Sequence, residues 1–176
     1  MDVVIRPATP HDIPALELLI PESVRALQKE HYSIQQIEGA LGTVFGVDSQ
    51  LIEDGTYLVA EAASNVVGCG GWSKRKTLFG SNHVTGKDDS LLDPSRDAAR
   101  IRAFFVHPAW SRRGIGGNIL KACEAAAAAQ GFTRFELGAT LSGEPLYRAH
   151  GYRATEHFEV ALANGASLPL IRMEKP

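Results

Sequence analysis

The chain has 176 residues, of which 44% are hydrophobic and 22% charged, and its formal net charge is −2. This length favours one domain over residues 1–176, and the composition is that of an ordinary globular protein. The slightly acidic balance argues against general nucleic-acid binding, which needs a basic surface. No apolar run approaches the roughly 20 residues of a membrane span. The N-terminus also lacks a signal-peptide pattern, so we expect a cytoplasmic protein with no membrane partner.

The first predicted elements are a short strand at residues 3–6 and a helix. Thr9, followed by a proline and then an acid, is typical of a helix start. Apolar residues then recur at helical spacing as far as Pro21, where we expect the helix to end. A second helix over residues 22–30 is predicted to follow it.

Two capping residues predict further helical segments before the strands begin. Ser33, with Gln36 three residues later, forms a capping box for a helix over residues 34–44. Asp48 is placed to cap one more turn before Gly55.

The hydrophobic pattern then changes to a period of two, which is typical of strands. Residues 56–63 and 66–75 predict a hairpin joined at Ser64-Asn65. Residues 77–98 are polar and rich in turn formers, so we expect a long surface loop. The sequence leaves open whether this loop forms a lid or is partly disordered.

The second half of the chain alternates strands and helices. Residues 100–107 carry bulky apolar side chains on both faces, which predicts a strand at the centre of a sheet. A helix over 115–130 follows and is expected to end at Gly131. The remaining predicted elements are a strand from about 134 to 137, a short helix at 144–150, and a hairpin of residues 152–162 and 167–174.

The segment "RRGIGG", residues 112–117, lies between the central strand and the following helix. Glycines let the backbone approach a ligand closely, and the first amides of a helix have no internal partners. With two arginines beside them, these amides predict an anion site for a pyrophosphate. A Walker loop is excluded because no Gly-Lys-Ser/Thr follows, and Ile119 excludes the dinucleotide fingerprint. The alternative is a tight turn with solvated arginines.

Two motifs resemble those of the GNAT superfamily of acetyl-CoA-dependent N-acetyltransferases. The first is "IRAFFVHPAWSRRGIGGNILKACEAAAAAQGF", a strand–loop–helix segment with the Gln/Arg-x-x-Gly-x-Gly/Ala pattern, although Ser111 stands at the Gln/Arg position. The second is "GEPLYRAHGY", residues 143–152. The resemblance implies an α/β (α+β) fold with a single mixed, mostly antiparallel central sheet. That sheet would have about six to seven strands, be flanked by helices and be splayed at the cofactor site.

The resemblance also implies roles for particular residues. The backbone of the central strand would pair with the pantetheine arm of acetyl-CoA, through Phe104, Phe105 and Val106. The loop amides would receive the pyrophosphate, namely those of Arg112, Arg113, Gly114, Ile115, Gly116 and Gly117. Tyr147 matches a tyrosine near the cofactor sulfur and would protonate the departing thiolate. Its alternative role is that of an aromatic packing residue.

The implied reaction is direct attack of a neutral primary amine on the thioester, with a backbone amide near Phe105 stabilising the oxyanion. Glu136 and Glu61 are rival candidates for the base, and each is otherwise a solvated carboxylate. Tyr32 and Trp72 are candidates for the acceptor site, although Trp72 fits a core position equally well. Cys69 and Cys123 are expected to be reduced core residues. Histidine spacing predicts no metal.

Three functions remain open at this point. The first is acetyl transfer to a small-molecule amine or a peptide. The second is acetylation of a protein N-terminus or lysine. The third is a non-catalytic regulatory module that binds acetyl-CoA. The sequence identifies neither the acceptor nor the base, and it does not decide between a monomer and a homodimer.

Overall fold

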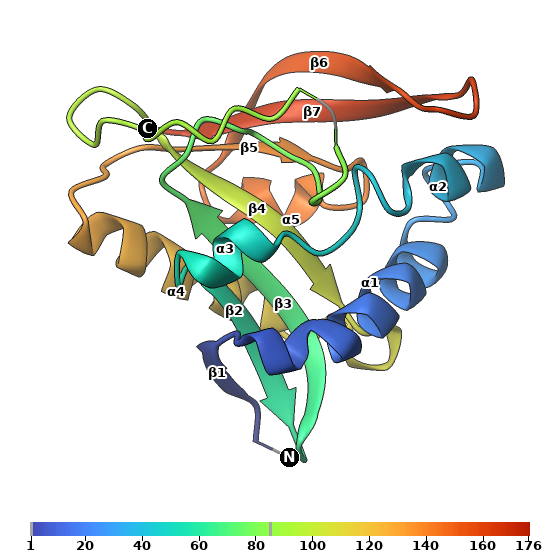
Figure 1. Cartoon of the computed structure of the whole chain (residues 1–176), viewed down its shortest axis with the longest axis horizontal. Helices are drawn as coiled ribbons and strands as arrows, with labels where there is room; N and C mark the ends of the chain where they lie inside the picture. Colours follow the sequence, from blue (N-terminus) through green and yellow to red (C-terminus); the bar gives the residue numbers. More distant parts are fainter. Residues whose placement is uncertain (1, 85) are drawn as a thin grey trace.

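A seven-stranded sheet runs through the computed structural model, which describes residues 2–84 and 86–176 (Figure 1). The strand order is β1-β2-β3-β4-β5-β7-β6, and β4 and β5 are parallel while the other neighbours are antiparallel. The strands are β1 Val4–Pro7, β2 Tyr57–Ala62, β3 Asn65–Ser73, β4 Ala99–Val106, β5 Phe135–Ala139, β6 Arg153–Ala161 and β7 Ser167–Lys175. The predicted mixed, mostly antiparallel sheet is confirmed.

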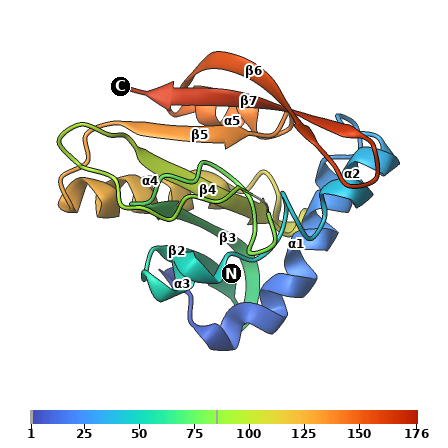
Figure 2. The same cartoon turned by 45° about the horizontal axis from the view of Figure 1, so that its top comes forward.

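Helices cover both faces of this sheet (Figures 1 and 2). They are α1 Ile13–Leu27, α2 Ile34–Ala40, α3 Ser49–Glu53, α4 Ile115–Ala129 and α5 Glu144–Ala149. One hydrophobic cluster joins α4 and Tyr147 of α5 to one face of the sheet. A second cluster joins α1, α2 and α3 to the opposite face. The central strand β4 therefore contributes side chains to both cores, as its doubly apolar pattern predicts.

The predicted helix end at Pro21 is wrong, and so is the separate helix at residues 22–30. Helix α1 continues through Pro21 as far as Leu27. An internal proline removes one backbone hydrogen bond and costs about 3 kcal/mol. Ser23 and Val24, which follow the proline, are buried where α1 packs against the sheet. The packing of this turn therefore offsets the cost. Tertiary contacts here override the local signal.

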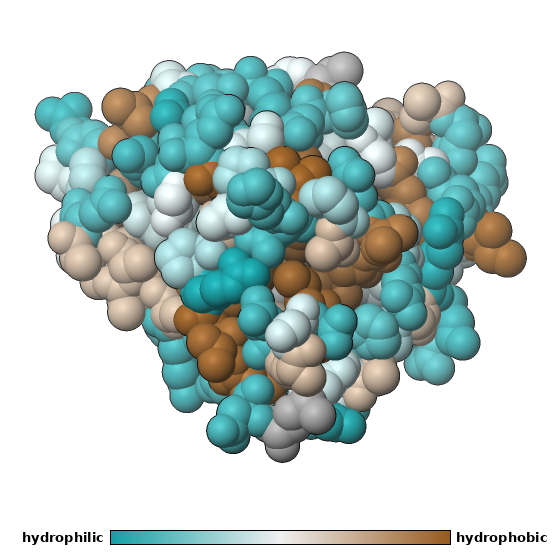
Figure 3. Space-filling view, turned by 60° about the horizontal axis from the view of Figure 1, so that its bottom comes forward, coloured by the Kyte–Doolittle hydropathy of each residue, from teal (hydrophilic) through white to brown (hydrophobic). Residues whose placement is uncertain are grey.

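The predicted helix at residues 34–44 is shorter in the structure, because α2 ends at Ala40. Its capping box is present: the Ser33 hydroxyl accepts from the Gln36 amide at 3.1 Å. Asp48 caps α3 as predicted, accepting from the Gln50 amide at 3.0 Å. Figure 3 shows one face of the molecule, mostly hydrophilic, with hydrophobic residues gathered toward its centre. No helix among the described residues is long and apolar enough to cross a membrane.

The sheet opens at β4, as expected. Strands β4 and β5 pair only at Ala99–Phe135 and Arg100–Glu136, and then separate. On its other side β4 has a bulge, because two of its residues lie opposite Gly70 of β3. Ala103 occupies the bulge with φ of 58°, and the Phe104 ring lies over Gly70, where a Cβ would come within 2.6 Å of it. Bulges re-aim side chains next to functional sites.

Candidate active site

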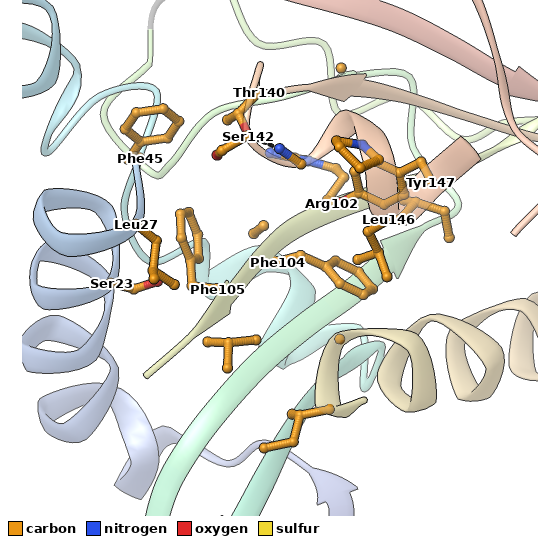
Figure 4. A pocket seen from close by; sticks show the side chains of 18 of the residues that line it. Ser23, Leu27, Phe45, Arg102, Phe104, Phe105, Thr140, Ser142, Leu146 and Tyr147 are labelled. Atoms are coloured by element: carbon orange, nitrogen blue, oxygen red, sulfur yellow. Dashed lines mark hydrogen bonds between the residues drawn. The ribbon is translucent and has the colours of Figure 1, made fainter. Parts of the chain in front are cut away.

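A cavity of about 710 Å³ lies where β4 and β5 separate. Strand β4 lines it from Ile101 to Val106. The ends of α1, α4 and α5 also contribute, as do Val44, Phe45, residues 78–80, the loop before α4, Leu170 and the segment after β5 that carries Thr140 and Ser142. Figure 4 shows the two sides of β4 in this cavity. Phe105 points toward Leu27 and Phe45, and Phe104 points toward Leu146 and Tyr147. Phe104, Phe105 and Val106, which are predicted to pair with the pantetheine arm, all line the cavity.

The loop before α4 presents unpaired amides to one end of this cavity. Ser111 donates its amide to Pro108 at 3.4 Å, and Asn118 donates to Gly114 at 3.0 Å. Among the described residues, none of the six intervening amides, 112–117, donates to a protein acceptor. Left-handed backbone at Arg112 (φ 59°) and Gly114 (φ 81°) turns the loop into the helix. Successive free amides at the positive end of a helix form an anion site.

The two loop arginines have different surroundings. Arg112 lines the cavity. The guanidinium of Arg113 lies 4.8 Å above the centre of the Trp110 ring, a cation–π contact that turns its side chain toward the preceding turn. The loop thus presents its backbone amides to an anion. The Arg112 side chain lines the cavity, and the Arg113 side chain is held against Trp110.

Tyr147 projects from α5 into the same cavity and is 8% exposed. Its ring meets those of Phe104 and Tyr152 edge-on, with centroids 6.2 and 5.8 Å away. Its hydroxyl has no hydrogen-bond partner in the described part of the chain. Burial, and secondarily the nearby Cys123, raises the pKa of the Tyr147 phenol well above its usual range. The phenol therefore stays protonated at neutral pH.

Neither carboxylate considered as a base lines the cavity. Glu136 accepts hydrogen bonds from Arg100 at 2.7 Å and Arg172 at 2.8 Å through one oxygen, Oε2. Glu61 accepts from Arg6 at 2.7 Å. Aspartate, glutamate, histidine and lysine are all absent from the lining within the described ranges, and its only ionisable side chains are Arg102, Arg112 and Tyr147.

Tyr32 and Trp72, considered for the acceptor site, lie in the core outside the cavity lining. The Tyr32 hydroxyl donates to the Pro169 carbonyl at 2.6 Å and accepts from the Leu141 amide at 3.1 Å. Trp72 is 2% exposed and packs edge-on against Phe132 at 5.8 Å. In this structure both aromatic side chains pack in the core, and neither lines the cavity.

The two cysteines are buried and free, as predicted. Burial raises the pKa of each thiol to about 12. Neither is therefore a thiolate at neutral pH, and a covalent acyl-cysteine has no activated nucleophile here. No group of three metal-ligating side chains occurs in residues 2–84 and 86–176.

Arg102 lines the cavity, although no sequence motif singled it out. This arginine is 5% exposed and forms an ion pair with Asp48 at 2.9 Å. The available signal was a charged residue within an otherwise apolar central strand, since such residues are rarely buried unless paired. Its partner is 54 residues away in sequence, so only the folded chain reveals the contact.

A family model described as an acetyltransferase (GNAT) domain matches residues 53–154, which include β4, the loop, α4 and Tyr147. The chain belongs to the GNAT family of acetyltransferases. A curated relative, the uncharacterized N-acetyltransferase YjcF of Bacillus subtilis (strain 168), is 40% identical over 62 residues. That match spans 35% of this chain and 42% of the relative's length.

Solved GNAT structures share the fold over almost the whole chain. A GCN5-related N-acetyltransferase from Rhodopseudomonas palustris has a TM-score of 0.73 at 22% identity, covering 99% of this chain and 96% of its own. The PaiA N-acetyltransferase of Thermoplasma acidophilum, in complex with coenzyme A, has a TM-score of 0.65 at 16% identity, covering 99% of both chains. YncA of Salmonella typhimurium, with acetyl-CoA, has a TM-score of 0.64 at 18% identity, covering 99% of this chain and 93% of its own.

Proposed function

We propose that this GNAT protein transfers an acetyl group from acetyl-CoA to a primary amine by direct attack. The observation that carries this proposal is the row of unpaired amides at residues 112–117 beside a cavity that also holds Tyr147. An anion site alone would suit many phosphorylated ligands. An anion site joined to an unpaired strand edge and a buried phenol suits a long thioester whose sulfur lies away from its phosphates.

The residues present fit coenzyme A. The amides of residues 112–117 would bind its pyrophosphate, with the Arg112 guanidinium adding positive charge. The free edge of β4 at Phe104, Phe105 and Val106 would pair with the pantetheine amides. Structures of two similar folds with coenzyme A or acetyl-CoA support this choice of ligand. Acetyl-CoA supplies the activated acetyl group.

Tyr147 is proposed to act as the acid. In the transfer, a bond forms between the amine nitrogen and the acetyl carbon, and the carbon–sulfur bond breaks. The sulfur leaves as a thiolate and takes the phenolic proton, while the proton lost by the amine replaces it through solvent. Because its pKa is raised, the phenol is protonated when the thiolate forms.

The amine must reach the thioester as a free base. No carboxylate or imidazole lines the cavity within the described residues, so we propose that the amine loses its proton to water before or during entry. This requirement favours an acceptor nitrogen of moderate basicity over a strongly basic one.

Two measurements test this function. Calorimetry with coenzyme A and with acetyl-CoA is expected to detect binding at one site. Thiol release is then followed with a panel of primary amines for the native protein and for Tyr147→Phe, and turnover of at least one amine is expected. Tight acetyl-CoA binding without release of the coenzyme A thiol in the presence of any amine would refute acetyl transfer and support a regulatory module.

A further inference from the structure

The half of the cavity on the Phe105 side combines apolar walls with hydroxyl groups and a positive charge. Its walls are apolar and aromatic, with the Phe45 and Phe105 rings in edge-to-face contact at 6.1 Å. Hydroxyls are available from Ser23, Thr140 and Ser142. The lining within the described ranges carries positive charge but no acidic side chain. A polycationic amine would find no counter-charge here, whereas an acceptor with its own negative group would.

Arg102 is the charged group in this half. It projects from β4, and in Figure 4 its guanidinium points toward the loop that carries Thr140 and Ser142. Only its Nη2 atom has protein partners among the described residues: the Asp48 carboxylate at 2.9 Å and the Gly80 carbonyl. Its Nε atom is buried without a partner. The Nη1 atom also has no protein partner among the described residues, and a carboxylate is the natural partner of such guanidinium donors.

The charges around Arg102 do not cancel. Asp48 also forms an ion pair with the Lys87 ammonium at 3.0 Å, and it caps α3. One fully buried carboxylate is therefore shared between two cations, Arg102 and Lys87. The next acidic group near Arg102 is Asp89, which is exposed. A positive charge is therefore left facing the cavity, where the low polarity of the walls strengthens attraction for an anion.

We propose that the acceptor is a primary amine that also carries a carboxylate and an apolar or aromatic body, and that Arg102 binds the carboxylate. This inference rests on the proposed acetyl transfer and names its substrate class. An aromatic amino carboxylate satisfies each feature: the ring packs among Leu27, Phe45 and Phe105, and the carboxylate neutralises the guanidinium. An arylamine nitrogen is also uncharged at neutral pH, as a cavity without a base requires.

Matched acceptors test the proposal on the native protein. Phenylalanine is compared with phenethylamine, and 4-aminobenzoate with aniline, so that each pair differs by a carboxylate. Spermidine serves as the polycation. We expect the carboxylated member to be preferred in kcat/KM by about ten- to a hundredfold, the range of a charge-assisted hydrogen bond. Equal kcat/KM within both pairs, or a preference for spermidine, would overturn the assignment.

Variants of Arg102 then test whether this residue causes the preference for carboxylated acceptors. Arg102→Met is expected to abolish it while leaving acetyl-CoA affinity unchanged. The matched control is Arg100→Met, two residues away on β4 and outside the cavity, which should keep the preference. If Arg102→Met does not fold, Arg102→Lys retains the charge and should weaken the preference. A preference that survives the Arg102 variants overturns the role of this residue.

The same assays separate this inference from the proposed function. Thiol release with the carboxylate-free amines alone would refute the acceptor class and leave acetyl transfer standing. Absence of thiol release with every amine, despite acetyl-CoA binding, would instead refute acetyl transfer and, with it, the acceptor class.

Discussion

Replacing Tyr147 by phenylalanine tests the proposed proton donor while keeping its ring. The contacts with Phe104 and Tyr152 are made by ring carbons, so the variant preserves them. The hydroxyl has no partner among the described residues, so its removal leaves no buried group unsatisfied. The free energy of unfolding should therefore change by no more than about 0.5 kcal/mol. General acid catalysis contributes about 10²- to 10⁴-fold, so kcat should fall by that factor.

The assay measures thiol release at saturating acetyl-CoA, beside chemical denaturation of both proteins. Tyr152→Phe is the matched control, because it removes a neighbouring phenol that donates to Glu124 at 3.2 Å outside the cavity lining. It should leave kcat unchanged. Since burial raises the pKa of Tyr147, the native protein should show no loss of kcat from this phenol below about pH 10. A kcat unchanged in Tyr147→Phe would refute the acid role.

Three further predictions concern the loop, the core and stability in acid. Gly114→Ala places a side chain on left-handed backbone, costs about 1–2 kcal/mol and should weaken calorimetric binding of acetyl-CoA. Gly165→Ala, strained alike in the β6–β7 turn, should lower stability alone; equal effects on binding would contradict this reading. Leu120→Ala, fully buried in α4, should lower the free energy of unfolding in denaturant by about 2–5 kcal/mol, unlike Leu18→Ala on the exposed side of α1. Hydrogen bonds from Arg6 lower the pKa of Asp12, so their stabilisation is full above the unfolded pKa of about 3.9 and is lost as pH falls through the folded value. Denaturation at several pH values should show a shallower loss below about pH 4 in Asp12→Asn, and an unchanged slope would contradict the pairing.

The sequence is most informative where function depends on the backbone. The loop at residues 112–117 needs glycine, a strand before it and a helix after it, and each of these is a local pattern. Tyr147 is also found by a local motif. These features lie close together in sequence, so the order of residues specifies their arrangement, and the structure places them around one cavity.

The sequence is least informative where a side chain has two compatible environments. Trp72 beside Gly70 and Gly71 fits a groove or a core, and only the packing against Phe132 decides for the core. Glu136 alternates with apolar residues in a strand, but its two arginine partners come from other strands. Helix α1 continues through Pro21 for the same reason, because its stability is determined by the face on which it packs.

The bulge at Ala103 connects the fold with the proposed chemistry. A non-glycine residue in left-handed conformation within a central strand is strained, and such strain persists only when surrounding contacts enforce it. Here the Ala103 carbonyl accepts from the Tyr57 hydroxyl at 2.8 Å, and Tyr57 is itself 1% exposed in the core.

Arg102 and Phe104 lie on either side of the bulge residue Ala103, and their side chains reach different parts of the cavity. In a regular strand, residues two positions apart share a face, so strict alternation would place both side chains on the same face of the sheet. The same distortion therefore directs Phe104 to Tyr147 and leaves Arg102 beside Asp48. One backbone feature thus sets the positions of both side-chain groups. They are the Phe104–Tyr147 pair, beside which the thioester is proposed to lie, and Arg102, which is proposed to bind the carboxylate of the acceptor.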